Sequence, residues 1–217
     1  MILRLLVLAW SLVVAACVPV PTPPVVSLEQ PPSAELDPLE EGEAVAVLPN
    51  RERESGFAAD CVRDKLAQGL PRNRVLTADQ ARDFLFPWLE PGQVPEDDAE
   101  VRVFMARRAV AEKLEGLRLR YLVVVDLSST GKLEDGVELL IGGFGYGRWS
   151  ARAIAQVVDL EAACCRRGGT ARATGIRGYA HMVFYGVVVL SSIEEPACDR
   201  LSAALVQELK PAASDAH

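Results

Sequence analysis

The apolar run at residues 5–14, which ends in two alanines and Cys17, determines how the rest of the chain is organised. One basic residue, Arg4, precedes the run. A basic start, a short apolar segment and small residues at its end are the layout of a secretory signal peptide. Prolines follow from position 19, and a permanent span needs ~20 apolar residues, so the run is too short to stay in a bilayer as a helix. We therefore expect residues 1–16 to direct export.

The four residues Val14-Ala15-Ala16-Cys17 resemble the lipobox of bacterial lipoproteins. The resemblance implies that the Cys17 sulfur receives a diacylglycerol group and that cleavage occurs before this residue. Two or more acyl chains give stable membrane anchoring without a span. By the usual sorting rule of that family, Val18 in place of Asp implies the outer membrane. The alternatives are an ordinary cleaved signal whose cysteine stands there by chance, and an uncleaved amino-terminal anchor.

Residues 17–43 are rich in proline and then acidic. The prolines are Pro19, Pro21, Pro23, Pro24, Pro31, Pro32 and Pro38, and the acidic residues towards the end are Glu35, Asp37, Glu40, Glu41 and Glu43. Such a segment buries too little apolar surface to offset its ordering entropy. We expect a disordered tether that holds the folded part up to ~70 Å from the membrane when fully extended.

Composition predicts one folded domain of moderate size over residues 44–210, followed by a disordered tail at residues 211–217. Half of the 217 residues are hydrophobic, and the formal net charge is −7. Loss of Arg4 with the signal leaves 22 basic residues against 30 acidic ones, a net charge of −8. Nucleic acid is an unfavourable partner for such a protein, because its phosphates repel acidic surfaces.

Hydrophobic periodicity predicts the elements of the first half of this domain. We expect strands at residues 44–48 and 74–77, a first helix capped by Ser55 and ended by Gly69 and Pro71, and a short helix at residues 78–85. A long helix is expected from Asp97 or Asp98 through Leu117, and the strongest strand at residues 120–127, which are apolar on both faces.

Glycines guide the interpretation of the second half. We expect a turn from Gly131 to Gly136, a strand at residues 149–160, a separation at Gly168-Gly169 and a second strand at residues 170–179, which together form an antiparallel hairpin. Residues 183–190 are apolar but too few for a membrane span. Pro196 is expected to start the last helix.

These elements predict an α+β fold, with one mixed, largely antiparallel sheet and helices packed on it. Their order, and phrases such as residues 120–125, are similar to the domain of exported lipoproteins akin to the amino-terminal domain of the Tol translocation protein and the curli-secretion lipoprotein. The resemblance implies an envelope role in assembly, scaffolding or partner binding, and it transfers no functional residue. No match to the pore-forming hairpins of the curli protein is found.

Cofactor motifs do not fit this sequence, and we expect no cofactor or metal. The glycines at residues 142–147 lack the G-x-G-x-x-G spacing and precede no helix, which favours a loop between strands. Gly131-Lys132 lacks the upstream glycine and the following Ser or Thr of a phosphate loop. A zinc site or a serine hydrolase would depend on His181, because the second histidine, His217, ends the chain.

Paired carboxylates at Glu194-Glu195 and Asp97-Asp98 are the acid–base candidates. Adjacent residues on loops rarely converge on one substrate, so the leading hypothesis is a lipid-anchored binding or assembly module with an envelope protein as partner. A hydrolase acting on an envelope polymer and a purely structural lipoprotein are the alternatives.

Three aromatic residues, Phe84, Phe86 and Trp88, lie within five positions of a chain with 6% aromatics. They predict either a small satellite core under a long loop or an exposed docking surface.

A disulfide between Cys61 and Cys198 is the last expectation. Four cysteines remain once Cys17 is acylated, and an oxidising compartment permits their pairing in three ways. Cys164 and Cys165 are adjacent, so a bond between them would strain the peptide. Cys61 lies on or beside the apolar face of the first helix and Cys198 at the start of the last one, and both helices must cover the same sheet. The alternative is that both thiols are free and buried.

Overall fold

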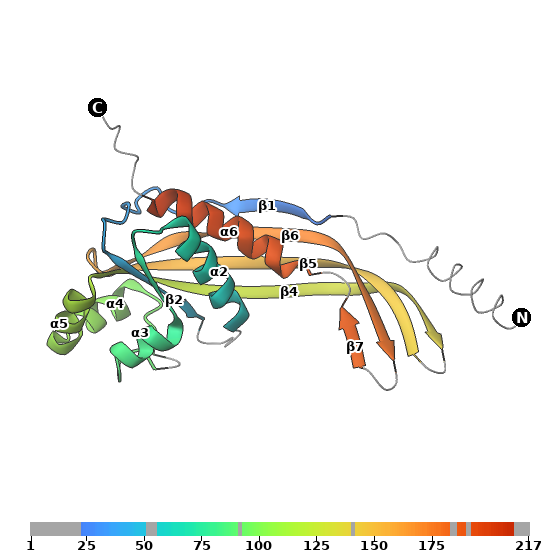
Figure 1. Ribbon diagram of the computed structural model, residues 1–217, viewed down its shortest axis with the longest axis horizontal. Helices are drawn as coiled ribbons and strands as arrows, with labels where there is room; N and C mark the ends of the chain where they lie inside the picture. Colours follow the sequence, from blue (N-terminus) through green and yellow to red (C-terminus); the bar gives the residue numbers. More distant parts are fainter. Residues whose placement is uncertain are drawn as a thin grey trace, which may run out of the picture.

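A computed structural model of the protein describes residues 23–50, 56–90, 93–139, 142–182, 186–189 and 192–210. They form an α+β fold around one seven-stranded mixed sheet of order β1-β6-β5-β4-β2-β3, with β7 paired to β6 (Figure 1). The strands are β1 Val25–Gln30, β2 Ala44–Pro49, β3 Arg74–Leu76, β4 Leu119–Leu139, β5 Gly142–Asp159, β6 Cys164–Met182 and β7 Gly186–Val189. β2 pairs in parallel with β3 and β4, and every other pairing is antiparallel.

Helices cover both faces of the sheet's central part. On one face lie α2 (Gly56–Gly69) and α6 (Glu194–Leu209), and on the other lie α3 (Ala78–Phe84), α4 (Asp98–Met105) and α5 (Arg108–Leu117). Alternation along β2 supplies both cores: Val45 and Val47 face α2 and α6, whereas Ala46 and Leu48 face α3 to α5. This explains why β2 reads as an apolar run without alternation.

Several expected elements are confirmed. Strands occur at β2 and β3, helices at α2 and α3, and the strongest strand lies at the centre within β4. The last helix begins at Glu194, two residues before the expected Pro196. The expected cap Ser55 lies outside the described residues.

The single long helix expected up to Leu117 is wrong, because the chain leaves the helical conformation at Arg107 (φ −79°, ψ 110°). Hydrophobic phase gives the reason. Val101 and Phe104 are buried in α4, and an unbroken helix would carry that face on to Arg108 and Glu115. The break shifts the phase, so that Val110, Leu114 and Leu117 are the buried residues of α5 instead.

The turns and the loop expected at glycines are also wrong. β4 continues through Gly131–Gly136, residues 142–147 belong to β5, and β6 runs through Gly168 and Gly169. These glycines allow close approach instead: a Cβ at Gly131 would overlap the ring of Trp149, and Gly169 (φ +104°) lies at a bulge. The hairpin itself turns at residues 160–163.

The folded part begins earlier than the expected boundary at Ala44. β1 adds an antiparallel edge strand to β6, with Val25 opposite Thr174, and the following Leu36 and Leu39 are buried in the core. The Tyr121 hydroxyl, buried under this segment, donates to the Asp37 carbonyl (2.9 Å) and accepts from the Asp37 N–H (3.1 Å). Prolines are compatible with this arrangement because they flank an edge strand. The expected signal peptide, the lipidated Cys17 and the tail 211–217 lie outside the described residues.

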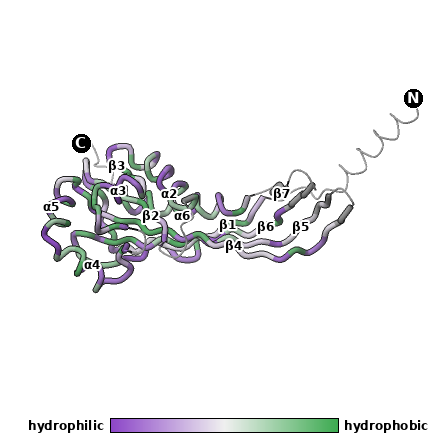
Figure 2. The backbone as a smooth tube through the Cα atoms, turned by 90° about the horizontal axis from the view of Figure 1, so that it is seen from below, coloured by the Kyte–Doolittle hydropathy of each residue, from purple (hydrophilic) through white to green (hydrophobic). Residues whose placement is uncertain are grey.

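Strands β4, β5 and β6 extend beyond all the helices (Figures 1 and 2). We call this extension the arm, and define it as residues 130–139, 142–150 and 174–182 together with β7. Across the strands, Thr130, Ser150 and Thr174 stand in register with Val25, so β1 starts where the arm begins. The helix-covered part of the molecule is called the body.

Candidate functional site: a crevice between β2 and β3

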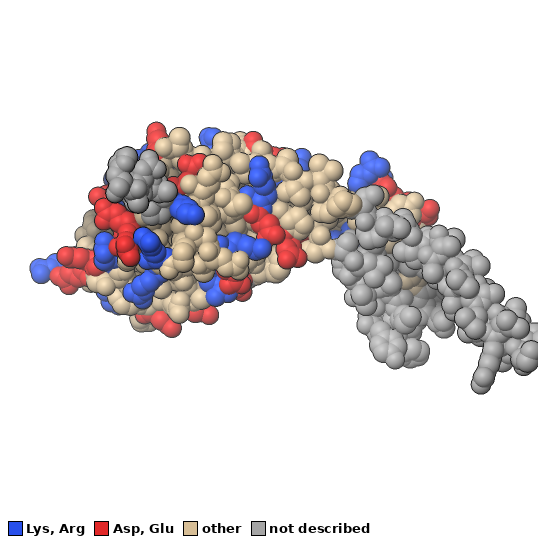
Figure 3. All heavy atoms as spheres, turned by 45° about the horizontal axis from the view of Figure 1, so that its top comes forward, with Lys and Arg blue, Asp and Glu red and all other residues tan. Residues whose placement is uncertain are grey.

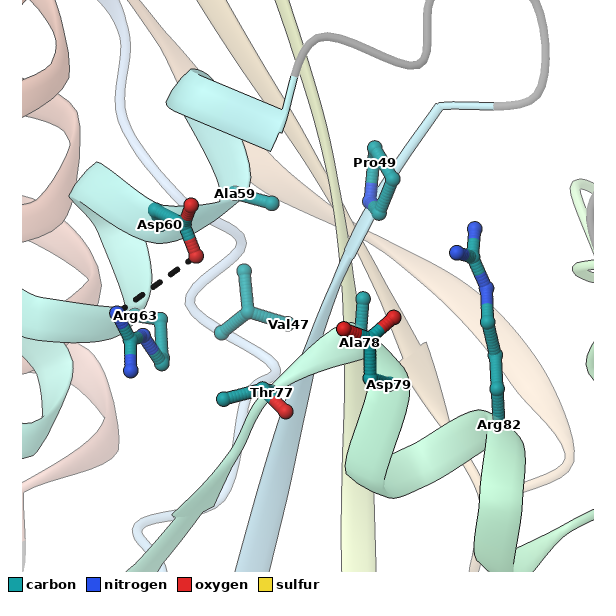
Figure 4. A pocket seen from close by; sticks show the side chains of 9 residues that line it. All are labelled: Val47, Pro49, Ala59, Asp60, Arg63, Thr77, Ala78, Asp79 and Arg82. Atoms are coloured by element: carbon teal, nitrogen blue, oxygen red, sulfur yellow. Dashed lines mark ion pairs between the residues drawn. The ribbon is translucent and has the colours of Figure 1, made fainter.

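A crevice opens at the carboxyl ends of the parallel strands β2 and β3 (Figure 4). The connection from β2 runs through α2 on one face, and the connection from β3 runs through α3 on the other. Neighbouring parallel strands whose connections diverge in this way leave a gap beyond their carboxyl ends, the usual ligand position in open α/β sheets. The crevice has a volume of about 220 Å³ and is lined by Val47, Pro49, Ala59, Asp60, Arg63, Thr77, Ala78, Asp79 and Arg82.

The local sequence fixes the wall formed by α3. Thr77 is the N-cap of this helix: its hydroxyl accepts a hydrogen bond from the Gln80 N–H (3.1 Å), and the Gln80 side chain accepts one from the Thr77 N–H (3.0 Å). This reciprocal capping box sets the start of the helix. It thereby places Asp79 and Arg82 along one side of the crevice.

Two guanidinium groups stand on opposite walls, Arg63 on α2 and Arg82 on α3 (Figure 4). Arg63 is bound to Asp64 (2.7 Å) and to Asp60 (3.6 Å). The Nε atoms of both arginines are buried and have no acceptor among the described residues. Buried N–H groups in proteins nearly always have a partner from the protein, water or a bound molecule.

This arrangement suits a ligand that carries oxyanion groups. Guanidinium N–H groups match carboxylate and phosphate oxygens, and the Thr77 hydroxyl can donate as well. Asp60 and Asp79 lie at the same crevice and balance the two positive charges. The site therefore favours a polar, elongated group that offers acceptors to both walls over a small free anion.

The expected disulfide is confirmed. Cys61 and Cys198 are bonded, with their Cα atoms 6.4 Å apart, and they join α2 to α6 on one face of the sheet. Cys164 and Cys165 are free and lie next to each other at the start of β6. Burial raises the pKa of both thiols, so both are protonated at neutral pH.

The structure places the acid–base candidates on opposite sides of the sheet. Glu194 forms an ion pair with Arg177 and accepts from the Ser192 hydroxyl (3.1 Å) and the Ile193 N–H (3.2 Å). Burial is the largest single influence and would raise its pKa, but the hydrogen bond and positive charge of Arg177, together with backbone and Ser129 hydrogen bonds, outweigh it, and the net pKa is lowered. A carboxylate held ionised in this way is poorly suited to act as a general acid. Glu195 lies beside it in the exposed first turn of α6.

Asp97 and Asp98 have structural contacts on the other face. Asp97 caps α4 by accepting from the Glu100 N–H (2.8 Å), and Asp98 accepts from the Cys165 N–H (2.6 Å). His181 is a β6 residue opposite Gly143, and its side chain is outside what the structure describes. The acid–base candidates therefore do not converge on one site.

The aromatic segment is held by Lys113. Its ammonium group donates to the carbonyls of Phe84 (2.7 Å) and Phe86 (3.3 Å) and lies 5.4 Å from the centre of the Trp88 ring. Phe86 is 60% exposed. A shallow groove lies between this segment and α4, so the segment is neither wholly core nor wholly free surface.

The crevice arginines were not among the residues singled out from the sequence. The usable signal was Thr77-Ala78-Asp79-Gln80 directly after a short strand, since a capping box at a strand-to-helix junction marks the carboxyl edge of a parallel sheet. Charge gives no help in locating the site: on the face drawn in Figure 3, basic and acidic side chains lie interspersed over the body.

None of the helices in the described part of the chain is long and apolar enough to cross a membrane.

Comparison with known proteins yields only distant likeness. No protein-family model matches the sequence, and no curated protein matches it. Among solved structures, the chain is similar to a PelC dodecamer from Paraburkholderia phytofirmans, with 14% identity over 83% of this chain and 98% of that one and a TM-score of 0.39. It is also similar to the hypothetical protein CT253 from Chlamydia trachomatis, with 12% identity over 78% and 94% of the two chains and a TM-score of 0.30. Likeness at this level carries no functional argument.

Proposed function

We propose that the protein is a lipid-anchored envelope lipoprotein that binds an oxyanion-bearing group of an envelope partner in the crevice between β2 and β3. The observation that carries the binding role is the pair of buried guanidinium Nε atoms on opposite walls of that crevice, neither of which has an acceptor among the described residues. A bound carboxylate or phosphate group would supply the missing acceptors.

The proposed address comes from the amino terminus. Val14-Ala15-Ala16-Cys17 resembles a lipobox, and Val18 after the cysteine supports the outer membrane, with the folded part facing the periplasm. The Cys61–Cys198 disulfide is in keeping with export, because such bonds form and persist in oxidising compartments. We propose binding in preference to hydrolysis because Glu194, Asp97 and Asp98 each hold a structural contact.

Site-specific photo-crosslinking in intact cells tests this function. A photoreactive amino acid at Asp79, on the crevice wall, should give a discrete adduct with an envelope component. The same amino acid at Arg108, whose side chain is 93% exposed on α5, serves as the control position and should give none.

The charge requirement is tested with matched neutralising substitutions. Arg82→Gln removes one of the two crevice guanidinium groups and should reduce the Asp79 adduct strongly. The matched control is Arg108→Gln, which removes the same charge from an exposed position on α5 and should leave the adduct unchanged. An adduct that survives Arg82→Gln in full would show that the crevice is not the binding site.

A further inference from the structure

We infer that the arm is the part of the protein that rests on the lipid surface, with the body held farther from it. This inference depends on the proposed lipidation of Cys17. It follows from how short the remaining tether is and from where the chain enters the fold.

The tether has a small maximum reach. Only eight residue steps separate Cys17 from Val25, the first residue of β1. Whatever their conformation, eight residues span at most about 28 Å. Val25 therefore stays within that distance of the lipidated cysteine.

The chain enters the fold from the side of the arm. β1 runs antiparallel to β6, with Val25 opposite Thr174, and Pro24 lies against Gly175, the next residue of β6 towards the arm. Gly175 lies on the side of Thr174 that leads to Met182, where β6 ends, so the described residue before β1, Pro24, lies towards the arm. Figure 1 shows β1 beginning where the arm leaves the body.

Strand lengths decide which end can face the membrane. Leu119, at the body end of β4, lies eleven steps from Thr130, which is in register with Val25, a distance of about 37 Å. If the body end were the end resting on the membrane, Val25 would stand about 37 Å above it, beyond the reach of about 28 Å that eight residues allow. An upright orientation with the body end on the membrane is therefore excluded.

The arm fits the opposite orientation. Leu139, at the tip of β4, lies nine steps beyond Thr130, or about 30 Å. This length is slightly greater than the maximum reach of about 28 Å, so the tip meets the bilayer surface when the arm points towards it at a tilt that brings Val25 within reach.

The chemistry of the arm suits a lipid interface through apolar contact. Leu133 is a large apolar side chain on β4 and is 49% exposed. Positive and negative charges are balanced there. Arg148 pairs with Glu134 (3.3 Å), and the exposed Lys132 is followed three residues later by the exposed Asp135. We therefore expect the contact to be insensitive to salt, because apolar burial is not screened by ions.

Energy transfer to labelled lipid tests the orientation. The full lipidated chain, extracted from cells, is placed in vesicles of phosphatidylethanolamine and phosphatidylglycerol that contain an acceptor-labelled lipid. A fluorescent amino acid replaces Leu133 on the arm, or, as the matched control, Val103, which is 61% exposed on α4 in the body. Transfer from position 133 should exceed transfer from position 103 severalfold and persist in high salt. Equal transfer, or stronger transfer from position 103, would overturn the inference.

A longer tether tests the cause. Insertion of about ten Gly and Ser residues after Val20 lengthens the reach without changing the folded part, so the difference between the two positions should shrink. A Cys17→Ser chain separates this inference from the proposed anchor. If the unaltered chain binds vesicles no better than Cys17→Ser, the proposed lipidation is wrong. If it binds better but shows no stronger energy transfer from position 133, only the proposed orientation is wrong.

Discussion

Removal of the Cys61–Cys198 bond should lower stability more than any other single change in the cysteines. The bond closes a loop with a sequence separation of 137 residues. In the chain-entropy model a loop of this length restricts the unfolded chain by the equivalent of about 5 kcal/mol. That is a large fraction of the ~5–15 kcal/mol by which domains are usually stable.

The perturbation is the double variant Cys61→Ala/Cys198→Ala, and its matched control is Cys164→Ala/Cys165→Ala. The helices that carry the bond also pack through other side chains, such as Val206 against Gly69 and the buried Leu201. We therefore expect the variant to fold and to unfold at a temperature lower by about 10–20 °C. The control should shift by much less, because Cys164 and Cys165 close no loop.

Thermal and urea unfolding followed by far-UV circular dichroism measure the effect. Reduction of the unaltered protein should reproduce the double variant, and the dependence of unfolding free energy on urea should steepen once the bond is lost, because the unfolded chain becomes less compact. The reasoning is refuted if peptide mapping finds the bond intact and the two proteins nevertheless unfold at the same temperature and urea concentration.

Three further changes test the anchor, the early segment and the ion pair at α6. Cys17→Ser should abolish labelling by a fatty-acid probe and release or misprocess the chain; a labelled, membrane-bound variant contradicts lipidation. Tyr121→Phe removes the hydroxyl that binds both backbone groups of Asp37, so it should lower the free energy of unfolding by about 1–3 kcal/mol. It should also speed proteolysis of the segment before β2, and unchanged cleavage there contradicts the role of these two hydrogen bonds in holding the segment. Glu194→Gln should destabilise the protein at pH 7, because a depressed carboxyl pKa stabilises the fold while the group is ionised. The difference in stability should shrink as the pH falls towards the lowered pKa of Glu194, and a difference that does not change with pH contradicts the ion pair with Arg177 as its source.

Local pattern predicted the central elements because burial determines them. β2 and the first half of β4 lie in the middle of the sheet, covered on both faces, so their sequences are uninterrupted apolar runs. The pairing of Cys61 with Cys198 followed from the same reasoning, since two helices on one small sheet must lie close together.

Elements whose stability comes from distant partners were missed. β1 has exposed residues on both faces, with Val25 72% exposed, and its hydrogen bonds come from β6, about 150 residues later in the sequence. Nothing in its own sequence distinguishes it from a tether. The glycines of β4 and β5 led to a wrong prediction for a related reason. Gly131 has no Cβ, which leaves room for the ring of Trp149 on the neighbouring strand, and the local sequence does not reveal this contact.

The crevice is a product of topology and could not be read from residue types. Arg63 and Arg82 look like ordinary exposed arginines on amphipathic helices. They line the same crevice only because α2 and α3 leave adjacent parallel strands on opposite faces. A sequence method would need the order β4-β2-β3 before it could place them together.

The position of β1 also limits the distance between the crevice and the membrane. Pro49, at the carboxyl end of β2, is in register with Val125 of β4. Val125 lies five residues before Thr130, which is in register with Val25, so Pro49 lies about 17 Å from the level of Val25, on the side away from the arm. β2 is parallel to β4, so its carboxyl end, and with it the crevice, opens in the direction of the arm. With Cys17 anchored as proposed, the mouth of the crevice stays within about 45 Å of the bilayer. A partner bound there must therefore reach into the membrane-proximal layer, and the component crosslinked from Asp79 should sediment with membranes even after its link to this protein is cleaved.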